Sequence, residues 1–220
     1  MQLTGRITPD NLLTLEAYAR YRKEHRGEVI AHRRQRTVDL GQHLSVQFES
    51  EWTIRYQIQE MLHLEKIFEE TGIRAEIEAY APLVPDGSNW TATVMLAYPN
   101  VEERQRELRR LRGIEDHLYV AVDLQSPWGT PTQQQMPSPM PSTSTSTSTS
   151  RVYALADEDL DRERADKTSA VHFVRFQFTT AQVLAIQSGA AVALGCDHPH
   201  YLAETPIHAL TLASLRTDLR

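Results

Sequence analysis

The sequence predicts an α+β fold: a single domain with a mixed β-sheet flanked by helices. Apolar residues recur at three-and-four spacing along residues 53–70, which is typical of a helix facing a core. Side chains alternate between two faces along residues 170–178, as in a strand. With 220 residues and 40% hydrophobic content, the chain can form a substantial core. We therefore expect helices and strands packed in layers.

A helix and a hairpin are predicted to open the chain. Thr8 is placed to cap a helix that begins at Pro9 and continues toward His32, because proline suits the first helical position. Along residues 36–49 apolar and polar residues alternate, and Gly41-Gln42 lies between the two halves. We expect this segment to form two short strands joined by a tight turn.

A long helix follows, with one side facing the core and the opposite side in water. Ser50 caps this helix, with Thr53 in place of an acid at the third helical position, so we expect an incomplete capping box. Gly72 supplies the stop, since glycine adopts the left-handed conformation without steric cost. Residues 73–80 are predicted to form a shorter helix that Pro82 ends.

Two strand-helix-strand units complete the predicted fold. Each has a buried strand, a capped helix and a second apolar strand. We expect strands at 90–98 and 117–122 around a helix at 101–112, and strands at 170–178 and 190–194 around a helix that ends at Gln187. A short strand at 151–155 and a last helix at 207–219 accompany the second unit.

A disordered insertion separates the two units. Residues 125–150 contain five of the eleven prolines and no charged residue, and they end in an alternating Ser-Thr tract. Such a segment cannot bury enough apolar surface to offset the entropy of ordering it. The single domain is therefore predicted to consist of residues 1–124 and 151–220. We interpret the insertion as a tolerated surface loop, with a phosphorylation or interaction segment as the alternative.

The composition predicts a cytoplasmic protein with no membrane span. Cys196 is the single cysteine, which rules out an internal disulfide, and neither a signal peptide nor a run of about 18 apolar residues is found. Residues 1–36 hold eight basic and four acidic residues, a net charge of +4, so the remainder carries −10 of the total of −6. The basic patch at 32–36 could meet phosphates, but pairing with the protein's own acids is favoured over nucleic-acid binding.

Several segments resemble the bacterial family known as domain of unknown function 3501. They are Pro85-Asp86-Gly87-Ser88-Asn89, Lys167-Thr168-Ser169-Ala170-Val171-His172-Phe173 and Asp197-His198-Pro199 followed by Tyr201, together with residues 54–62, 113–116 and 156–160. The resemblance covers nearly the whole chain except the insertion, and it brings no activity with it. The resemblance implies that the protein is encoded beside rubrerythrin-like and iron-sulfur proteins, and hence that it has a role in oxidative stress or iron handling.

Polar residues in three segments are candidates for ligand binding. Glu60 lies one helical turn before His63, a spacing found in carboxylate-bridged metal helices, although an internal salt bridge is the simpler interpretation. The turn at residues 86–89 could offer backbone amides, and Lys167 with Thr168 could offer a cation and a hydroxyl to an anion. The predicted ligand-binding residues are Glu60, Asp86, Ser88, Asn89, Lys167 and Thr168.

Three further residues are candidate ligands of iron or zinc: His172, Asp197 and His198. The last two lie in a Cys-Asp-His-Pro-His run at the end of a buried strand. Ligands at alternate positions of a tight turn cannot easily meet one tetrahedral ion, so a turn held by side-chain hydrogen bonds is the alternative. His172 shares a strand face with apolar residues, and a hydrogen-bonded core histidine is the alternative there.

We expect a cytoplasmic binding or accessory protein that works with a rubrerythrin-like or iron-sulfur partner. The alternative is a metal-dependent enzyme, with His172 or His198 as ligand and Glu60 as base. A third hypothesis, a purely structural interaction protein, predicts that the candidate residues do not converge in space. The chain has no glycine-rich phosphate loop, nucleotide fingerprint, nucleophile elbow or HExxH motif, which disfavours the familiar hydrolases, kinases and dehydrogenases.

Overall fold

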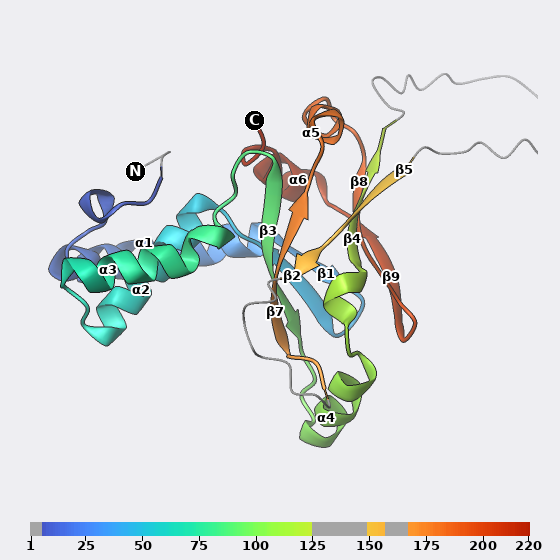
Figure 1. Cartoon of the computed structure of the whole chain (residues 1–220), viewed down its shortest axis with the longest axis horizontal. Coiled ribbons are helices and arrows are strands. Elements are labelled where there is room, and N and C mark those ends of the chain that lie inside the picture. The colour runs from blue at the N-terminus through green and yellow to red at the C-terminus, as the bar shows by residue number, and fades with distance from the viewer. Residues whose placement is uncertain (1–5, 125–148, 157–166) are drawn as a thin grey trace, which may run out of the picture.

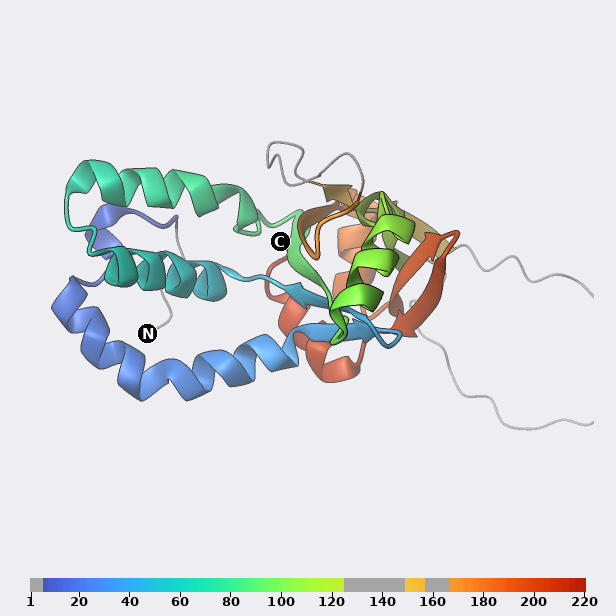
Figure 2. The same cartoon turned by 90° about the horizontal axis from the view of Figure 1, so that it is seen from below.

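The computed structural model describes residues 6–124, 149–156 and 167–220, which form an α+β fold (Figure 1). Two sheets enclose the main core, and three N-terminal helices project from one side as an arm (Figures 1 and 2). The α+β prediction is confirmed. The single mixed sheet, in contrast, is replaced by two sheets, in which every pairing between named strands is antiparallel.

The first sheet has five strands in the order β1-β2-β3-β7-β6, and the second has four in the order β5-β4-β8-β9. The strands of the first sheet are β1 (Thr37–Leu40), β2 (Leu44–Phe48), β3 (Asn89–Leu96), β6 (Leu155–Ala156) and β7 (Val171–Gln177). Those of the second sheet are β4 (Leu118–Asp123), β5 (Thr149–Tyr153), β8 (Val192–His198) and β9 (Tyr201–Pro206). The predicted β1–β2 hairpin is confirmed, whereas β9 was not predicted.

Each strand-helix-strand unit crosses from one sheet to the other, which explains why two sheets form. Helix α4 (Val101–Arg110) leads from β3 to β4, and α5 (Thr180–Gln187) leads from β7 to β8. Because β3 pairs with β7 and β4 pairs with β8, the two units interleave in antiparallel fashion. Neither unit returns to its own sheet as a parallel neighbour, which a mixed sheet would have required.

The core between the sheets is centred on aromatic side chains. The rings of Phe48 and Trp90 lie 5.7 Å apart, and those of Trp90 and Phe178 lie 4.8 Å apart, both edge to face. The indole Nε1 of Trp90 donates to the carbonyl oxygen of Leu215 at 3.0 Å. Leu215 lies in α6 (Ala209–Arg216), so the C-terminal helix both covers the core and satisfies its one indole donor.

The arm is built around its middle helix. It consists of α1 (Leu15–Gln35), α2 (Glu51–Glu65) and α3 (Glu70–Tyr80), followed by the short 3-10 helix η2 (Ala81–Leu83). Ile54, Ile58 and Leu62 of α2 pack toward α3, as their spacing predicted. The opposite side of α2 was predicted to face water, but it is also covered, because Tyr56 packs against Tyr18 of α1.

The start of the arm differs from the prediction. Pro9 opens a separate 3-10 helix, η1 (Pro9–Asn11), with Thr8 at its N-cap position, where the Thr8 amide donates to the Asn11 Oδ1 at 3.0 Å. Helix α1 begins later, at Leu15, where the Thr14 hydroxyl accepts a hydrogen bond from the amide of Ala17. Both caps are of the expected chemical type, so the sequence pattern contained two adjacent helix starts and only the first was recognised.

The ends of α2 also differ. Ser50 caps the helix as predicted, but the capping box is complete, because the Thr53 hydroxyl accepts from the Ser50 amide at 2.8 Å and the Ser50 hydroxyl accepts from the Thr53 amide at 3.2 Å. The helix ends at Glu65, and its C-cap, Lys66, is a non-glycine residue in the left-handed conformation with φ 60°. Gly72 therefore lies inside α3 and does not end α2.

The predicted insertion at residues 125–150 lies outside the described residues except for Thr149 and Ser150, which belong to β5. Strand pairing between β3 and β7 joins the segments on either side of the insertion, while their organisation as one domain stays a prediction. None of the helices in the described ranges combines the length and apolar character needed to cross a membrane.

A fully buried arginine links the arm to the sheets. Arg36, with no exposed surface, lies between α1 and β1. Its guanidinium donates to the carbonyl oxygens of Phe48 at 3.1 Å and Glu49 at 2.7 Å, and to Ser214 of α6 at 3.1 Å. It also forms an ion pair with Asp218. Burial raises the pKa of Asp218, and the adjacent Arg36 opposes that rise.

We predict that Arg36→Met strongly destabilises the protein. The substitution removes the cation that pairs with Asp218 and the donor to the carbonyl oxygens of Phe48 and Glu49, so the free energy of unfolding should fall by about 3–5 kcal/mol. Urea unfolding followed by circular dichroism measures this. The matched control is Arg34→Met at an exposed position of α1, expected to change stability by less than about 0.5 kcal/mol. Equal stability of the two variants would contradict the proposed role of Arg36.

His32, also at this junction, has a different pKa in the folded and unfolded chain. His32 packs its ring 4.8 Å from the Trp52 ring, and its Nε2 lies 3.0 Å from the Ser50 Oγ. Since the Ser50 Oγ accepts from the Thr53 amide, its own hydrogen can be donated to the unprotonated Nε2 of His32. Burial, together with the charges of Arg36 and Arg33, lowers the pKa of His32 to about 4.

This depressed pKa predicts a loss of stability in mild acid. The unfolded chain binds a proton at the usual histidine pKa of about 6.5, whereas the folded protein binds it only near pH 4. Stability from neutral His32 is thus complete above about pH 6.5, and about 2–3 kcal/mol is lost as the pH falls to about 4. In urea unfolding at several pH values, His32→Phe should show a shallower decline in this window. Identical declines would argue against a neutral His32.

Candidate functional site

Glu60 lies inside the arm, between α1 and α2. Its Oε1 accepts a hydrogen bond from the Tyr18 hydroxyl at 2.6 Å and pairs with the Arg22 Nε at 2.6 Å. Burial raises the pKa of Glu60, but the hydrogen bonds from Arg22 and Tyr18 outweigh it and lower the pKa overall. The ring of His63 packs edge-on against Tyr18, 5.9 Å between centroids. Glu60 is therefore engaged in an internal ion pair, the simpler of its two interpretations.

The turn at residues 86–89 uses its own polar groups. The Asp86 Oδ1 accepts from the amide and the hydroxyl of Ser88, both at 2.8 Å, and the Asn89 Oδ1 accepts from the Asp86 amide at 3.1 Å. Gln177 of β7 donates to the Ser88 hydroxyl at 2.8 Å. The turn amides that could have received an anion are thus engaged in holding the turn and fastening it to β7.

Thr168 and His172 come together with a residue that the sequence did not single out, Glu115 of η3 (Ile114–His117). The His172 Nε2 lies 2.9 Å from the Ser169 carbonyl oxygen, so this nitrogen carries the hydrogen. It also lies 3.0 Å from the Thr168 hydroxyl, which donates to the Glu115 Oε2 at 3.2 Å. Because Nε2 has no free lone pair, His172 cannot act as a base toward Thr168.

The buried cluster of Glu115, Thr168 and His172 therefore fastens the chain before β7 to η3. Lys167 precedes it and is only partly buried. The cluster does not approach the turn at residues 86–89, because Asn89 and Gln177 pair near one end of β3–β7 and Val94 and His172 near the other. Five residues of strand separate them, about 17 Å at roughly 3.3 Å per residue. The six predicted ligand-binding residues thus fall in three separate places.

Neither nitrogen of His198 is free to bind a metal. The His198 Nδ1 accepts from the amide of His200 at 3.2 Å, and its Nε2 lies 3.2 Å from the Arg112 carbonyl oxygen. Burial lowers the pKa of His198, which favours the neutral ring that this pattern requires. Across the described ranges, no group of three or more His, Cys, Asp or Glu residues is arranged to hold a metal ion. The alternative of a turn held by side-chain hydrogen bonds fits His198.

Asp197, in contrast, belongs to a partly exposed cluster on the outer face of the second sheet, in which Tyr119 is buried and Arg151, Tyr153 and Glu204 are exposed. We call this cluster the tyrosine–arginine face and define it by Tyr119, Arg151, Tyr153, Asp197 and Glu204. The Asp197 carboxylate accepts from the Tyr153 hydroxyl at 2.7 Å and lies 3.5 Å from the Arg151 Nη1. The Tyr119 hydroxyl donates to the Glu204 Oε2 at 2.8 Å, and the Arg151 guanidinium lies 4.2 Å from the centre of the Tyr119 ring.

The neighbouring His117 completes this cluster. Its Nδ1 lies 3.0 Å from the Asp197 Oδ1, while 42% of its side chain is exposed. The hydrogen bond from Tyr153, followed by that from His117, lowers the pKa of Asp197. Burial and the contact with Glu204 raise the pKa of Tyr119 to about 12. Asp197 is thus a carboxylate held in place by several donors on an open surface.

A glycine below the ring makes this arrangement possible. Gly195 of β8 pairs with Tyr119 of β4, and the Tyr119 ring lies directly over it. A Cβ at position 195 would lie 2.2 Å from the Tyr119 ring. The sequence reasoning missed Gly195, Tyr119 and Arg151, because their association depends on strand register. The only local signal was a glycine within an apolar strand, which often marks a close approach.

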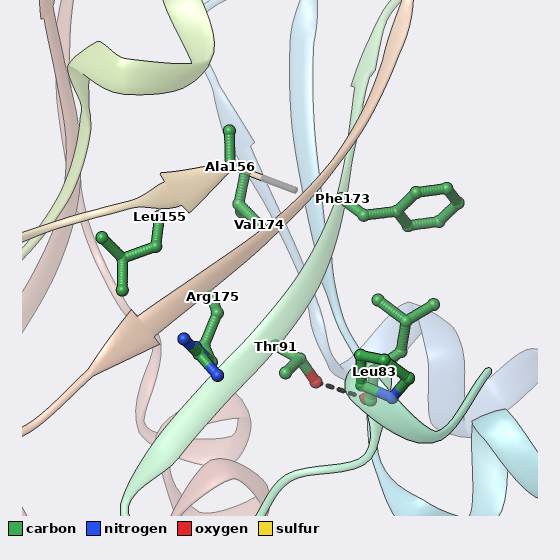
Figure 3. A pocket seen from close by; sticks show the side chains of 8 residues that line it. Leu83, Thr91, Leu155, Ala156, Phe173, Val174 and Arg175 are labelled. Atoms are coloured by element: carbon green, nitrogen blue, oxygen red, sulfur yellow. Dashed lines mark hydrogen bonds between the residues drawn. The ribbon is translucent and has the colours of Figure 1, made fainter. Parts of the chain in front are cut away.

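The structure also contains a hollow of about 140 Å³ between η2 and the outer side of the first sheet (Figure 3). Its wall includes Pro82, Leu83, Leu155 and Phe173. The Thr91 hydroxyl, on β3, donates to the Leu83 carbonyl oxygen at 2.6 Å and joins the two sides. Arg175 of β7 also lines it. None of these residues was predicted as a site, since they come from three distant segments.

We predict that Gly195→Ala displaces the Tyr119 ring and destabilises the protein. Overpacking of this kind should lower the free energy of unfolding by about 1–3 kcal/mol, measured by urea unfolding. In a Tyr119→Ala background the same substitution does not clash with a ring, and it should lower the free energy of unfolding by less than about 0.5 kcal/mol. An equal cost in both backgrounds would rule out the packing of Tyr119 on Gly195.

Comparison with known proteins places the chain in a family without an assigned activity. A solved structure, described as a novel protein of unknown function from Burkholderia pseudomallei, is 46% identical, with a TM-score of 0.82 over 98% of this chain and 100% of that one. No curated protein matches the chain. The model of the family described as protein of unknown function (DUF3501) matches residues 6–144 and 140–219. The chain therefore belongs to the DUF3501 family.

Proposed function

We propose that this protein is a non-catalytic accessory protein that binds a partner protein through the tyrosine–arginine face. The observation that carries the proposal is that Tyr119 and Asp197 hold the exposed side chains of Arg151, Tyr153 and Glu204 in place. A preformed surface loses little conformational freedom on binding. Tyrosine and arginine, moreover, supply much of the binding energy in protein interfaces.

The hydrogen bonds within the face indicate an acidic partner segment. Both carboxylates of the face are already engaged, Asp197 by Tyr153 and Glu204 by Tyr119. The Arg151 side chain remains 47% exposed, and guanidinium groups bind carboxylates with paired hydrogen bonds. At the two edges of this sheet, Tyr153 of β5 is 44% exposed and Leu202 of β9 is 75% exposed. These features fit a partner segment with an acidic residue next to an apolar one.

The partner class comes from the family resemblance. It implies rubrerythrin-like or iron-sulfur proteins, so we propose a cytoplasmic role beside such proteins in oxidative stress or iron handling. The separation of the candidate ligand-binding residues favours an interaction protein over a ligand-binding enzyme. No specific observation on the described residues favours the metal-dependent enzyme, because Glu60, His172 and His198 each make internal hydrogen bonds.

We predict that Arg151→Ala combined with Tyr153→Ala weakens partner binding. The probe is the purified rubrerythrin-like protein encoded in the same genome, and titration calorimetry measures the dissociation constant. Loss of two central contacts should raise it by about 10- to 100-fold, and added salt should weaken wild-type binding more than binding by the variant.

The matched control is Arg109→Ala, an exposed arginine on α4, which should bind as the wild type does. Circular dichroism confirms that each variant is folded. Wild-type affinity in the double variant would contradict use of this face. Absence of any binding to the rubrerythrin-like protein, and to an iron-sulfur protein from the same genome, would contradict the proposed partner class.

A further inference from the structure

We infer that the hollow beside Arg175 is a binding site for a small organic carboxylate. In this site the Arg175 guanidinium would receive the carboxylate, and the apolar wall would cover a short hydrocarbon tail. The hollow lies on the first sheet, whereas the tyrosine–arginine face belongs to the second. The inference therefore stands apart from the proposed partner binding.

The strand register places a cation next to apolar side chains. Arg175 of β7 pairs with Thr91 of β3 on one side and with Leu155 of β6 on the other, so these three side chains share one face of the sheet. Phe173 lies two residues before Arg175 and points to the same side. Figure 3 shows Leu83 opposite these strands, with its carbonyl group joined to Thr91. The hollow thus has one charged corner beside an apolar wall formed by Leu83, Leu155 and Phe173.

Arg175 has no counter-ion within the described part of the chain. Its guanidinium makes no hydrogen bond or ion pair to another described residue. The nearby carboxylate on this face of the sheet, Glu49, is already engaged, because Thr93 donates to its Oε1 at 2.7 Å and Thr53 donates to its Oε2 at 2.6 Å. A cation without a partner beside an apolar wall favours a ligand with the matching pair of features, a carboxylate and a short tail.

The size of the hollow limits the ligand. Its volume of about 140 Å³ corresponds to roughly five water molecules at about 30 Å³ each. This is well below the volume of about 300 Å³ at which drug-sized ligands begin to fit. A four-carbon monocarboxylate such as butyrate has the right size and charge. So few atoms in an open hollow give a dissociation constant in the range of about 1–10 mM.

The test uses sodium butyrate as the probe and the full chain labelled with ¹⁵N. We expect titration to shift the Arg175 side-chain Nε signal and the amide signals of Leu83, Thr91 and Leu155, with other regions unchanged. Butyramide has nearly the same shape without the charge and should bind at least about tenfold more weakly. Arg175→Gln should weaken butyrate binding by a similar factor, whereas Arg109→Gln on α4 should leave it unchanged.

Three results would overturn the inference. The first is the absence of shifts at these residues when butyrate is raised about tenfold above the expected dissociation constant. The second is equal binding of butyramide and butyrate, and the third is equal binding of butyrate by Arg175→Gln and wild type; either would show that the charge does not contribute to binding. Arg175 is exposed, so Arg175→Gln should fold normally. Arg151 and Tyr153 lie on the other sheet. A negative result with butyrate would therefore not affect the proposed partner binding, which the Arg151→Ala, Tyr153→Ala variant tests.

Discussion

The arrangement of the whole molecule depends on one buried guanidinium. Arg36 lies where α1 gives way to β1, and it binds the end of β2 and the C-terminal helix region through Asp218 at the same time. A buried ion deprived of its partners costs several kcal/mol, so these elements hold their relative positions wherever Arg36 is satisfied. The chain enters α2 directly after Glu49, whose carbonyl oxygen Arg36 binds. Two of the three arm helices are thus anchored at the same point on the two sheets.

This architecture explains how the polar residues are used. Glu60 joins two arm helices, the turn at residues 86–89 is fastened to β7, Thr168 and His172 hold the approach to β7, and His198 holds the turn between β8 and β9. Residues that the sequence suggested as ligand-binding or metal-binding candidates therefore stabilise junctions between helices and strands. Arg151 on the second sheet and Arg175 on the first are among the charged groups that remain accessible. Both are cations beside aromatic or apolar side chains, which suits binding to acidic partners or ligands.

Local patterns predicted local structure well. The cap at Ser50, the β1–β2 hairpin and the helix from Thr180 to Gln187 are all present, because neighbouring residues determine them. What failed depends on distant segments: strand register divides the strands between two sheets, and it places Tyr119 over Gly195. The basic patch at residues 32–36 was expected to pair within the protein, and Arg36 does so, but its partner Asp218 lies 182 residues away. Lys66 takes a conformation that glycine usually favours, so Gly72 gave a misleading stop.

The most direct test of the role of Arg36 is whether the arm and the two sheets unfold together. Trp52 lies in the arm and Trp90 in the core between the sheets, so each tryptophan reports on one part. Variants that keep only Trp52 or only Trp90, with phenylalanine at the other two tryptophan positions, allow each part to be followed by fluorescence in urea. Coupling through Arg36 predicts that each reporter's unfolding midpoint coincides with the circular dichroism midpoint of the same variant. If the Trp52 fluorescence midpoint lay at a clearly lower urea concentration than the circular dichroism midpoint, the coupling would be contradicted and the arm would unfold independently.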